Sequence, residues 1–184
     1  DLSSLIFVEG SKSNLEYMAI AINELKIPED VHITGKNTSF TVPGLLLCKG
    51  NVRIDGLEYN AESIEIPEGT VDGDTNLRLI YKNSLVVQGK AKATALNTVI
   101  KGEQSVAAFG GTIVGKHNLD MLVSYSVVIC GGRLSGHNVI HRAGAMVNVL
   151  GITNSYHGIF DSLSGFEFGN VHTTYVDAPT STAA

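Results

Sequence analysis

Apolar residues near the start of the chain recur every three or four positions, which is the spacing of one face of an α-helix. They are Leu15, Met18, Ala19, Ile22 and Leu25. The preceding Ser13-Asn-Leu-Glu16 has the form of a capping box, in which the hydroxyl and the carboxylate each satisfy a free backbone N–H. Pro28 ends the pattern. This part of the sequence therefore predicts an α-helix over about residues 13–25.

The chain after Pro28 consists of short runs of Val, Ile, Leu, Tyr and Phe separated by Gly, Asn or Asp, which is typical of strands and turns. Many runs are apolar on successive residues, as in Leu45–Cys48 and Ser84–Val87. Hairpin dipeptides occur only at Asp55-Gly56 and Asp72-Gly73. The pattern favours an all-β solenoid whose strands stack in parallel from coil to coil. A helix before the first coil would cover its exposed edge.

The length of 184 residues predicts a single domain. We expect a lead-in at residues 1–12, a capped β-helix over 13–177 and a flexible tail at 178–184. Because the chain opens at Asp1 without Met, we also expect a fragment of a longer protein. No stretch approaches the roughly 20 apolar residues of a membrane helix. The net charge of −5 argues against a nucleic-acid partner, which would require a basic face.

Charged residues are scarce in the second half of the chain. From residue 103 onward the sequence has three basic and five acidic residues, whereas 23 of its 31 charged residues lie in the first 102. A surface so poor in charge is most simply covered by other chains. We therefore expect an oligomer.

Two segments resemble the start of known β-helices. The segment from Glu16 to Ile33 is similar to the opening of pectate-lyase-like right-handed β-helices, in which a short capping helix precedes an Ile-Pro-containing strand. The segment from Leu46 to Gly56 is similar to a first coil of phage tailspikes and related depolymerases. The resemblance implies a right-handed parallel β-helix with an N-terminal capping helix. It also implies a trimeric, extracellular virion protein of the phage tail that acts on polysaccharide.

Motifs for nucleotides and metals are incomplete. The run from Gly110 to Lys116 has P-loop spacing, but His117 stands where Ser or Thr should hold Mg²⁺, so we expect a glycine turn between coils. The sequence Asp72-Gly-Asp-Thr-Asn76 alternates oxygen ligands as a calcium loop does, yet lacks the later Gly and Glu of an EF-hand. We expect a solvated turn there, with a weak structural calcium site left open. Cys48 and Cys130 fit core thiols. We expect no cofactor and no metal centre.

Three carboxylates stand out in the charge-poor half: Asp120, Asp161 and Glu167. Glycosidic cleavage requires two carboxylates that flank the bond, so these residues are the candidate catalytic groups. Alternation along 165–169 places Glu167 opposite its two flanking Phe residues. Aromatic rings stack on sugars and Arg binds carboxylates, which gives a candidate substrate-binding set of Arg133, His141, Arg142, Tyr156 and His157. The alternative for each residue is a solvated surface position or a contact between chains.

The first functional hypothesis is a tailspike-like homotrimer that binds, and in one version depolymerises, a host surface polysaccharide. Its expected partners are the polysaccharide and other virion tail proteins, with no nucleic acid and no membrane insertion. The second hypothesis is a non-enzymatic fibre or adhesin module that serves trimer assembly and host attachment. A third is a small intracellular scaffold that polymerises into filaments.

Overall fold

The computed structural model describes the backbone of residues 5–102, 107–123, 127–129, 133–143, 146–162 and 165–176. Side chains are described for residues 5–102, 110–122 and 133–140. These residues form a single fourteen-stranded sheet in which every pairing is parallel. The strands are β1 (Lys12–Glu16), β2 (Ala19–Ala21), β3 (Leu25–Ile27), β4 (His32–Lys36), β5 (Ser39–Cys48), β6 (Asn51–Asp55), β7 (Leu57–Asp72), β8 (Asn76–Gly102), β9 (Ala107–Phe109), β10 (Thr112–Val123), β11 (Val127–Ile129), β12 (Arg133–Ala143), β13 (Met146–Ser162) and β14 (Gly165–Val176).

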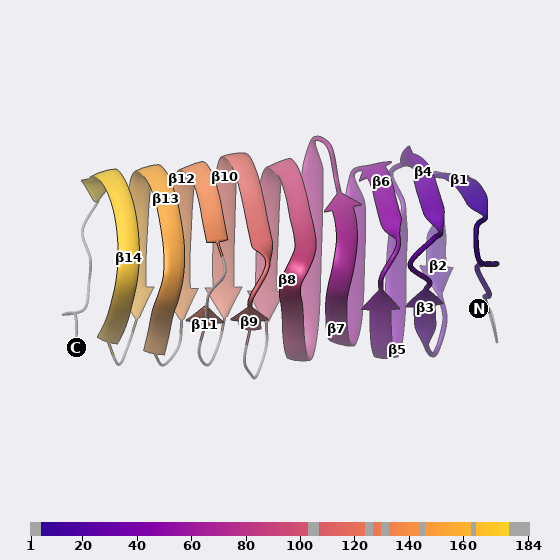
Figure 1. Cartoon of the computed structure of the whole chain (residues 1–184), viewed down its shortest axis with the longest axis horizontal. Coiled ribbons are helices and arrows are strands. Elements are labelled where there is room, and N and C mark those ends of the chain that lie inside the picture. The colour runs from indigo at the N-terminus through magenta and orange to yellow at the C-terminus, as the bar shows by residue number, and fades with distance from the viewer. Residues whose placement is uncertain are drawn as a thin grey trace.

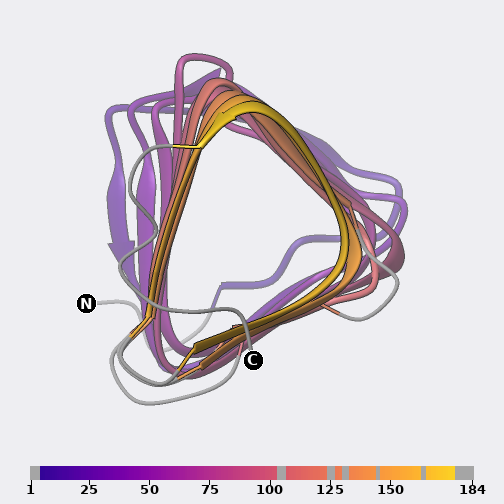
Figure 2. The ribbon, with the colours of Figure 1, turned by 90° about the vertical axis from the view of Figure 1, so that its left-hand side faces the viewer.

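The sheet winds into a parallel β-solenoid, as predicted. Lys12 is paired with His32, Thr70 with Lys92 and Ile152 with Asn170, so one coil takes 18–22 residues. The coils lie side by side along the long axis of the molecule (Figure 1). Viewed along that axis, the chain encloses a triangle (Figure 2). The right-handed sense implied by the resemblance stays a prediction.

The strand pairings define three faces. Face 1 contains β1, β4, β6 and residues 70–72, 92–95, 112–115, 133–136, 152–155 and 170–173. Face 2 contains β2 and residues 39–42, 57–61, 77–81, 97–102, 118–123, 138–143, 157–162 and 175–176. Face 3 contains β3, β9, β11 and residues 45–48, 63–66, 84–87, 146–149 and 165–168.

A continuous apolar core fills the inside of the triangle. Alternate residues of each strand point inward, as in β6, where Val52 and Ile54 are buried and their neighbours are exposed or half-buried. The largest buried side chains include Phe40 and Tyr59, whose rings meet edge to face with centroids 5.7 Å apart. Cys48 is also fully buried, which confirms the core position predicted for it, and Cys130 lies outside the described residues.

The predicted capping helix over 13–25 is wrong. These residues form β1 and β2 and the start of β3, and each strand pairs with the next coil. Pairing satisfies the backbone groups of Ser13 without a capping box, and the Glu16 side chain instead accepts a hydrogen bond from Asn14. Corners interrupt the two-residue alternation of the strands, and the interruption produces the three-to-four spacing that resembles a helix. Met18 is exposed, whereas Ile20 and Ile22 point into the core.

The described N-terminal end of the core is covered by an extended segment. Residues 5–10 cross the open end of the triangle, visible as the indigo trace in Figure 2. Phe7 inserts into the core cluster with 8% of its surface exposed, and Leu5 packs against the same cluster. Ile6 and Val8 alternate with them and face solvent. An apolar plug thus has the role that the sequence assigned to a helix. Within the described residues, no helix has the length and apolar character needed to span a membrane.

Candidate functional site

Polar side chains form rows along the outer surfaces, because residues in register on adjacent coils lie about 4.8 Å apart. Thr34 donates a hydrogen bond to Asn14 Oδ1 at 3.2 Å, and Ser84 donates one to Ser63 at 3.2 Å. Arg78 and Glu58 form an ion pair at 3.2 Å on face 2. Such side-chain bonds connect each coil to the next and so stiffen the solenoid.

One such row, within the described side chains, is an asparagine ladder on face 2. Asn118 Nδ2 donates to Asn97 Oδ1 at 2.7 Å, and Asn138 Nδ2 donates to Asn118 Oδ1 at 2.9 Å. The ladder begins where Asn97 Nδ2 donates to the Thr75 carbonyl at 3.4 Å. His157 holds the next position in register after Asn138. The amides satisfy one another, which fits a structural role for the row.

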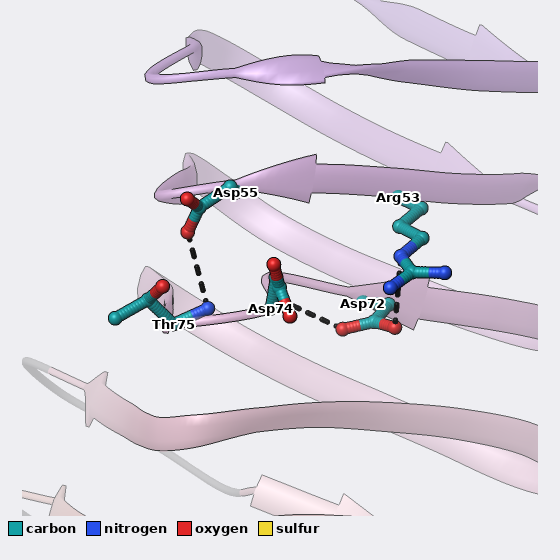
Figure 3. Close-up of polar contacts among 5 residues, drawn as sticks. All are labelled: Arg53, Asp55, Asp72, Asp74 and Thr75. Atoms are coloured by element: carbon teal, nitrogen blue, oxygen red, sulfur yellow. Dashed lines mark hydrogen bonds and ion pairs between the residues drawn. The ribbon is translucent and has the colours of Figure 1, made fainter.

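An acidic corner between faces 1 and 2 contains the residues predicted to form a turn or a weak calcium site (Figure 3). Asp72 Oδ1 accepts the backbone N–H of Asp74 at 2.8 Å, and its other oxygen lies 3.8 Å from Arg53 Nε. Asp55 Oδ1 accepts the N–H of Thr75 at 3.1 Å. Two of the three carboxylates are therefore engaged in fixing the turn. Among the residues with described side chains, no three His, Cys, Asp or Glu gather closely enough to hold a metal ion.

The structure separates the predicted catalytic carboxylates. Asp120 and Asp161 both lie on face 2, whereas Glu167 lies on face 3. Asp120 is half-buried, with its Oδ1 atom shielded from solvent. Asp161 is in register with Arg142 on the coil before it, and Arg142 is in register with Leu122. Face 2 therefore brings Asp120, Arg142 and Asp161 onto neighbouring strands.

The other predicted substrate-binding residues are spread over the solenoid. Arg133 is exposed on face 1 and in register with Thr112. His141 is in register with the buried Met121 on face 2. Tyr156 lies at the corner between faces 1 and 2, next to His157. These positions do not converge with Glu167 on one site.

Among the residues with described side chains, the titrating groups with clearly shifted pKa values lie inside the core. Burial raises the pKa of the Cys48 thiol to about 11, against a smaller opposing effect of the hydrogen bond from Tyr59. Burial also raises the pKa of the phenols of Tyr59 and Tyr81. A catalytic carboxylate with a shifted pKa would be the usual mark of an acid/base site. Cys48, Tyr59 and Tyr81 are core residues that solvent does not reach, so their raised pKa values do not indicate an acid/base site.

An open groove of about 720 Å³ lies beside the N-terminal plug. The plug segment forms one wall, and the outer sides of β3 and of Leu45 and Leu47 form the other. Exposed apolar groups of Ile6 and Val8 border it, together with the charged residues Glu24 and Lys26. None of the residues predicted from the sequence to be catalytic or substrate-binding lines this groove.

Sequence reasoning missed an apolar strip on the outer surface of face 2. Near the start of the face the outward positions are charged, as in Glu58 and Arg78. Further along they include four half-buried aliphatic residues, Ile80, Val99, Leu122 and Ile140, with Lys101 and Asp120 in the same rows. Val99 and Ile140 are both in register with Asp120, and Leu122 is in register with Lys101. Pairs of consecutive apolar residues such as Val99-Ile100 could have indicated the strip in the sequence, because one residue of each pair must face outward from a strand.

No family model matches the chain, and neither the curated proteins nor the solved structures contain a match to it.

Proposed function

We propose that the chain is a structural module of a homo-oligomeric fibre or spike, whose copies pack side by side through face 2. The observation that carries the proposal is the apolar strip of Ile80, Val99, Leu122 and Ile140. Half-buried aliphatic side chains on the outside of a solenoid favour burial against another chain, and Asp120 and Lys101 among them would supply polar contacts in that interface. The rows of mutually bonded polar side chains favour a stiff shaft. A trimer, attachment to a host surface and a place in the virion are proposed from the resemblance of the segment from Leu46 to Gly56 to a tailspike coil, since the capping-helix part of the resemblance is absent from β1–β3.

A charged strip should abolish assembly. The double change Val99→Asp with Ile140→Asp is expected to convert a trimer into monomers, because unpaired carboxylates beside Asp120 in an interface cost about 3 kcal/mol, or more than 100-fold in Kd. Light scattering over a wide concentration range measures the mass, and circular dichroism reports the fold. Val114→Asp is the matched control, since Val114 is a half-buried valine on face 1 and the trimer should persist. A monomeric parent chain, or a trimer that survives the double change, would refute the proposal.

A second candidate function is cleavage of a polysaccharide on face 2, favoured by the placement of Asp120, Arg142 and Asp161 there. It is an alternative to packing through that face, because Asp120 lies in register between Val99 and Ile140. The two aspartates lie two strands apart and are offset by two residues, about 12 Å between backbone positions. Inverting glycosidases hold their carboxyl groups about 6.5–9.5 Å apart, whereas retaining enzymes hold them closer. The backbone spacing is wider than both ranges, so the two side chains would have to extend toward each other. The proposed version is inversion, which uses the larger separation, with Asp120 and Asp161 as acid and base and Arg142 as a substrate contact. Glu167 lies on another face and takes no part.

Cleavage is tested by release of reducing ends from purified bacterial O-chain and capsular polysaccharides. Asp120→Asn and Asp161→Asn are each expected to lower the rate at least about 100-fold, as loss of a general acid or base does. Glu167→Gln is the control and should retain full activity. No release by the parent chain, or equal activity of all three variants, would exclude this function and leave the structural one standing.

A further inference from the structure

The corner between faces 1 and 2 repeats one backbone conformation on successive coils. Tyr17, Asn37, Gly56 and Asp74 follow the face 1 strands of four consecutive coils, and their φ angles are 53°, 48°, 74° and 52°. The first three donate their backbone N–H to the next coil, as Tyr17 does to the Lys36 carbonyl at 2.9 Å. The corner therefore requires a left-handed residue at this position.

Tyr17 is the wrong type of residue for that conformation. Gly adopts a left-handed φ without steric cost, and Asn and Asp tolerate it because their short side chains bond to nearby backbone. A bulky aromatic residue in the same region is strained. Strain of this kind persists at functional sites more often than elsewhere. The three other corners use the tolerant types, so the geometry does not itself call for an aromatic ring.

The ring of Tyr17 adds little to the stability of the fold in return. Its side chain is 68% exposed, and the adjacent Met18 is 44% exposed. Lys36 Nζ lies 5.2 Å from the ring centroid, which places an ammonium over one part of the ring. Cation–π contacts at exposed sites are weak. Neither burial nor this contact accounts for the choice of tyrosine.

Polar residues lie on the strand that leads to Tyr17 and on the strand paired with it. Glu16 precedes it and is in register with Lys36, and Asn14 donates a hydrogen bond to Glu16 Oε1 at 3.3 Å. A protein-binding hot spot would be set in a wider apolar area. An exposed aromatic face with an ammonium over it, and with a carboxylate and an amide on the same strand, matches a sugar ring instead, which presents an apolar C–H face and a rim of hydroxyls.

We propose that Tyr17, Glu16 and Lys36 form a carbohydrate-binding platform at the first coil. A pyranose ring stacks on Tyr17, its hydroxyls donate hydrogen bonds to the Glu16 carboxylate, and the Lys36 ammonium donates to its oxygens. The corner fixes the backbone from which the ring projects, so binding has to order only the side chain. The platform lies on a corner of the first coil, apart from the apolar strip of face 2, and does not depend on assembly through that strip.

Binding is measured by saturation-transfer NMR and calorimetry with four probes: cellohexaose, maltohexaose, chitohexaose and hyaluronan hexasaccharide. At least one is expected to bind, and Tyr17→Asn should weaken that binding more than tenfold. Tyr17→Phe keeps the ring and should bind within about threefold of the parent chain. Asn37→Gly changes the equivalent corner of the next coil and should leave binding unchanged.

Stability provides a second, independent measurement. Tyr17→Asn relieves the left-handed strain and is expected to raise Tm by about 2–4 °C while binding is lost. A gain in stability together with a loss of affinity is the result that a merely structural tyrosine would not give. The proposal is overturned if none of the four probes binds, if Tyr17→Asn binds as tightly as the parent chain, or if Tyr17→Asn lowers Tm.

Discussion

Replacement of Gly69 by alanine is expected to lower the free energy of unfolding by at least about 3 kcal/mol. Gly69 has φ +84° and lies in β7 at the corner between faces 3 and 1. An added Cβ would lie 2.3 Å from the Gly50 carbonyl oxygen and 2.8 Å from that of Lys49. Both atoms belong to the backbone of the preceding coil, so relief requires the two coils to separate.

The measurement is urea-induced unfolding followed by circular dichroism, with Gly89→Ala as the matched control. Gly89 precedes the next passage of the chain onto face 1, and a Cβ there would have only the Gly110 carbonyl oxygen near it, at 3.9 Å. That substitution should be neutral or stabilising by up to about 1 kcal/mol, because alanine restricts the unfolded chain. Equal effects of the two substitutions would contradict the close approach of coils at Gly69.

Truncation of Phe40 to alanine is expected to cost about 3–5 kcal/mol. Phe40 is fully buried between coils, and its ring packs edge to face against Tyr59 on the following coil. The substitution removes a large apolar group and leaves a cavity that the neighbouring strands cannot close without loss of register. Thermal and urea unfolding would report the change as a lower transition midpoint.

Phe7→Ala tests the contribution of the N-terminal plug to stability, as Phe40→Ala tests that of the core. Phe7 contacts the core from its end, so its loss should expose the first coil without unfolding the coils beyond it. Hydrogen exchange is expected to increase in β1, β2 and β3 and to stay slow in β7. An unchanged unfolding midpoint for Phe40→Ala together with a strongly lowered one for Phe7→Ala would contradict the view that Phe40 stabilises the core and Phe7 only covers its end.

The candidate site illustrates the difference between local pattern and coil geometry. Alternation along 165–169 predicted that Glu167 takes the opposite side of the strand from its flanking Phe residues. In the structure, Phe166 is in register with Val147 and Phe168 with Val149 on the coil before. The sequence could not place Glu167 on a different face from Asp161. That separation depends on how many residues each corner takes, and the corners differ from coil to coil.

The helix predicted over 13–25 failed for a related reason. Amphipathic spacing of three to four residues arises in a helix, but it also arises when short strands with two-residue alternation are broken by corners at Tyr17 and Asn23. Pairing with β4 and β5 decided between the two, because it satisfies the backbone and buries Ile20 and Ile22 together. A sequence without its partner coil does not contain that information.

The sequence by itself determined that this protein is an all-β solenoid with an apolar interior, because short apolar runs and frequent turn residues are local properties. It also showed that charged residues are scarce in the second half of the chain. Only the tertiary structure decided the register of 18–22 residues per coil, and with it which side chains share a row. A shift of one residue moves a side chain from the core to the surface. The apolar strip of face 2, the asparagine ladder and the strained Tyr17 therefore exist only once the coils are stacked.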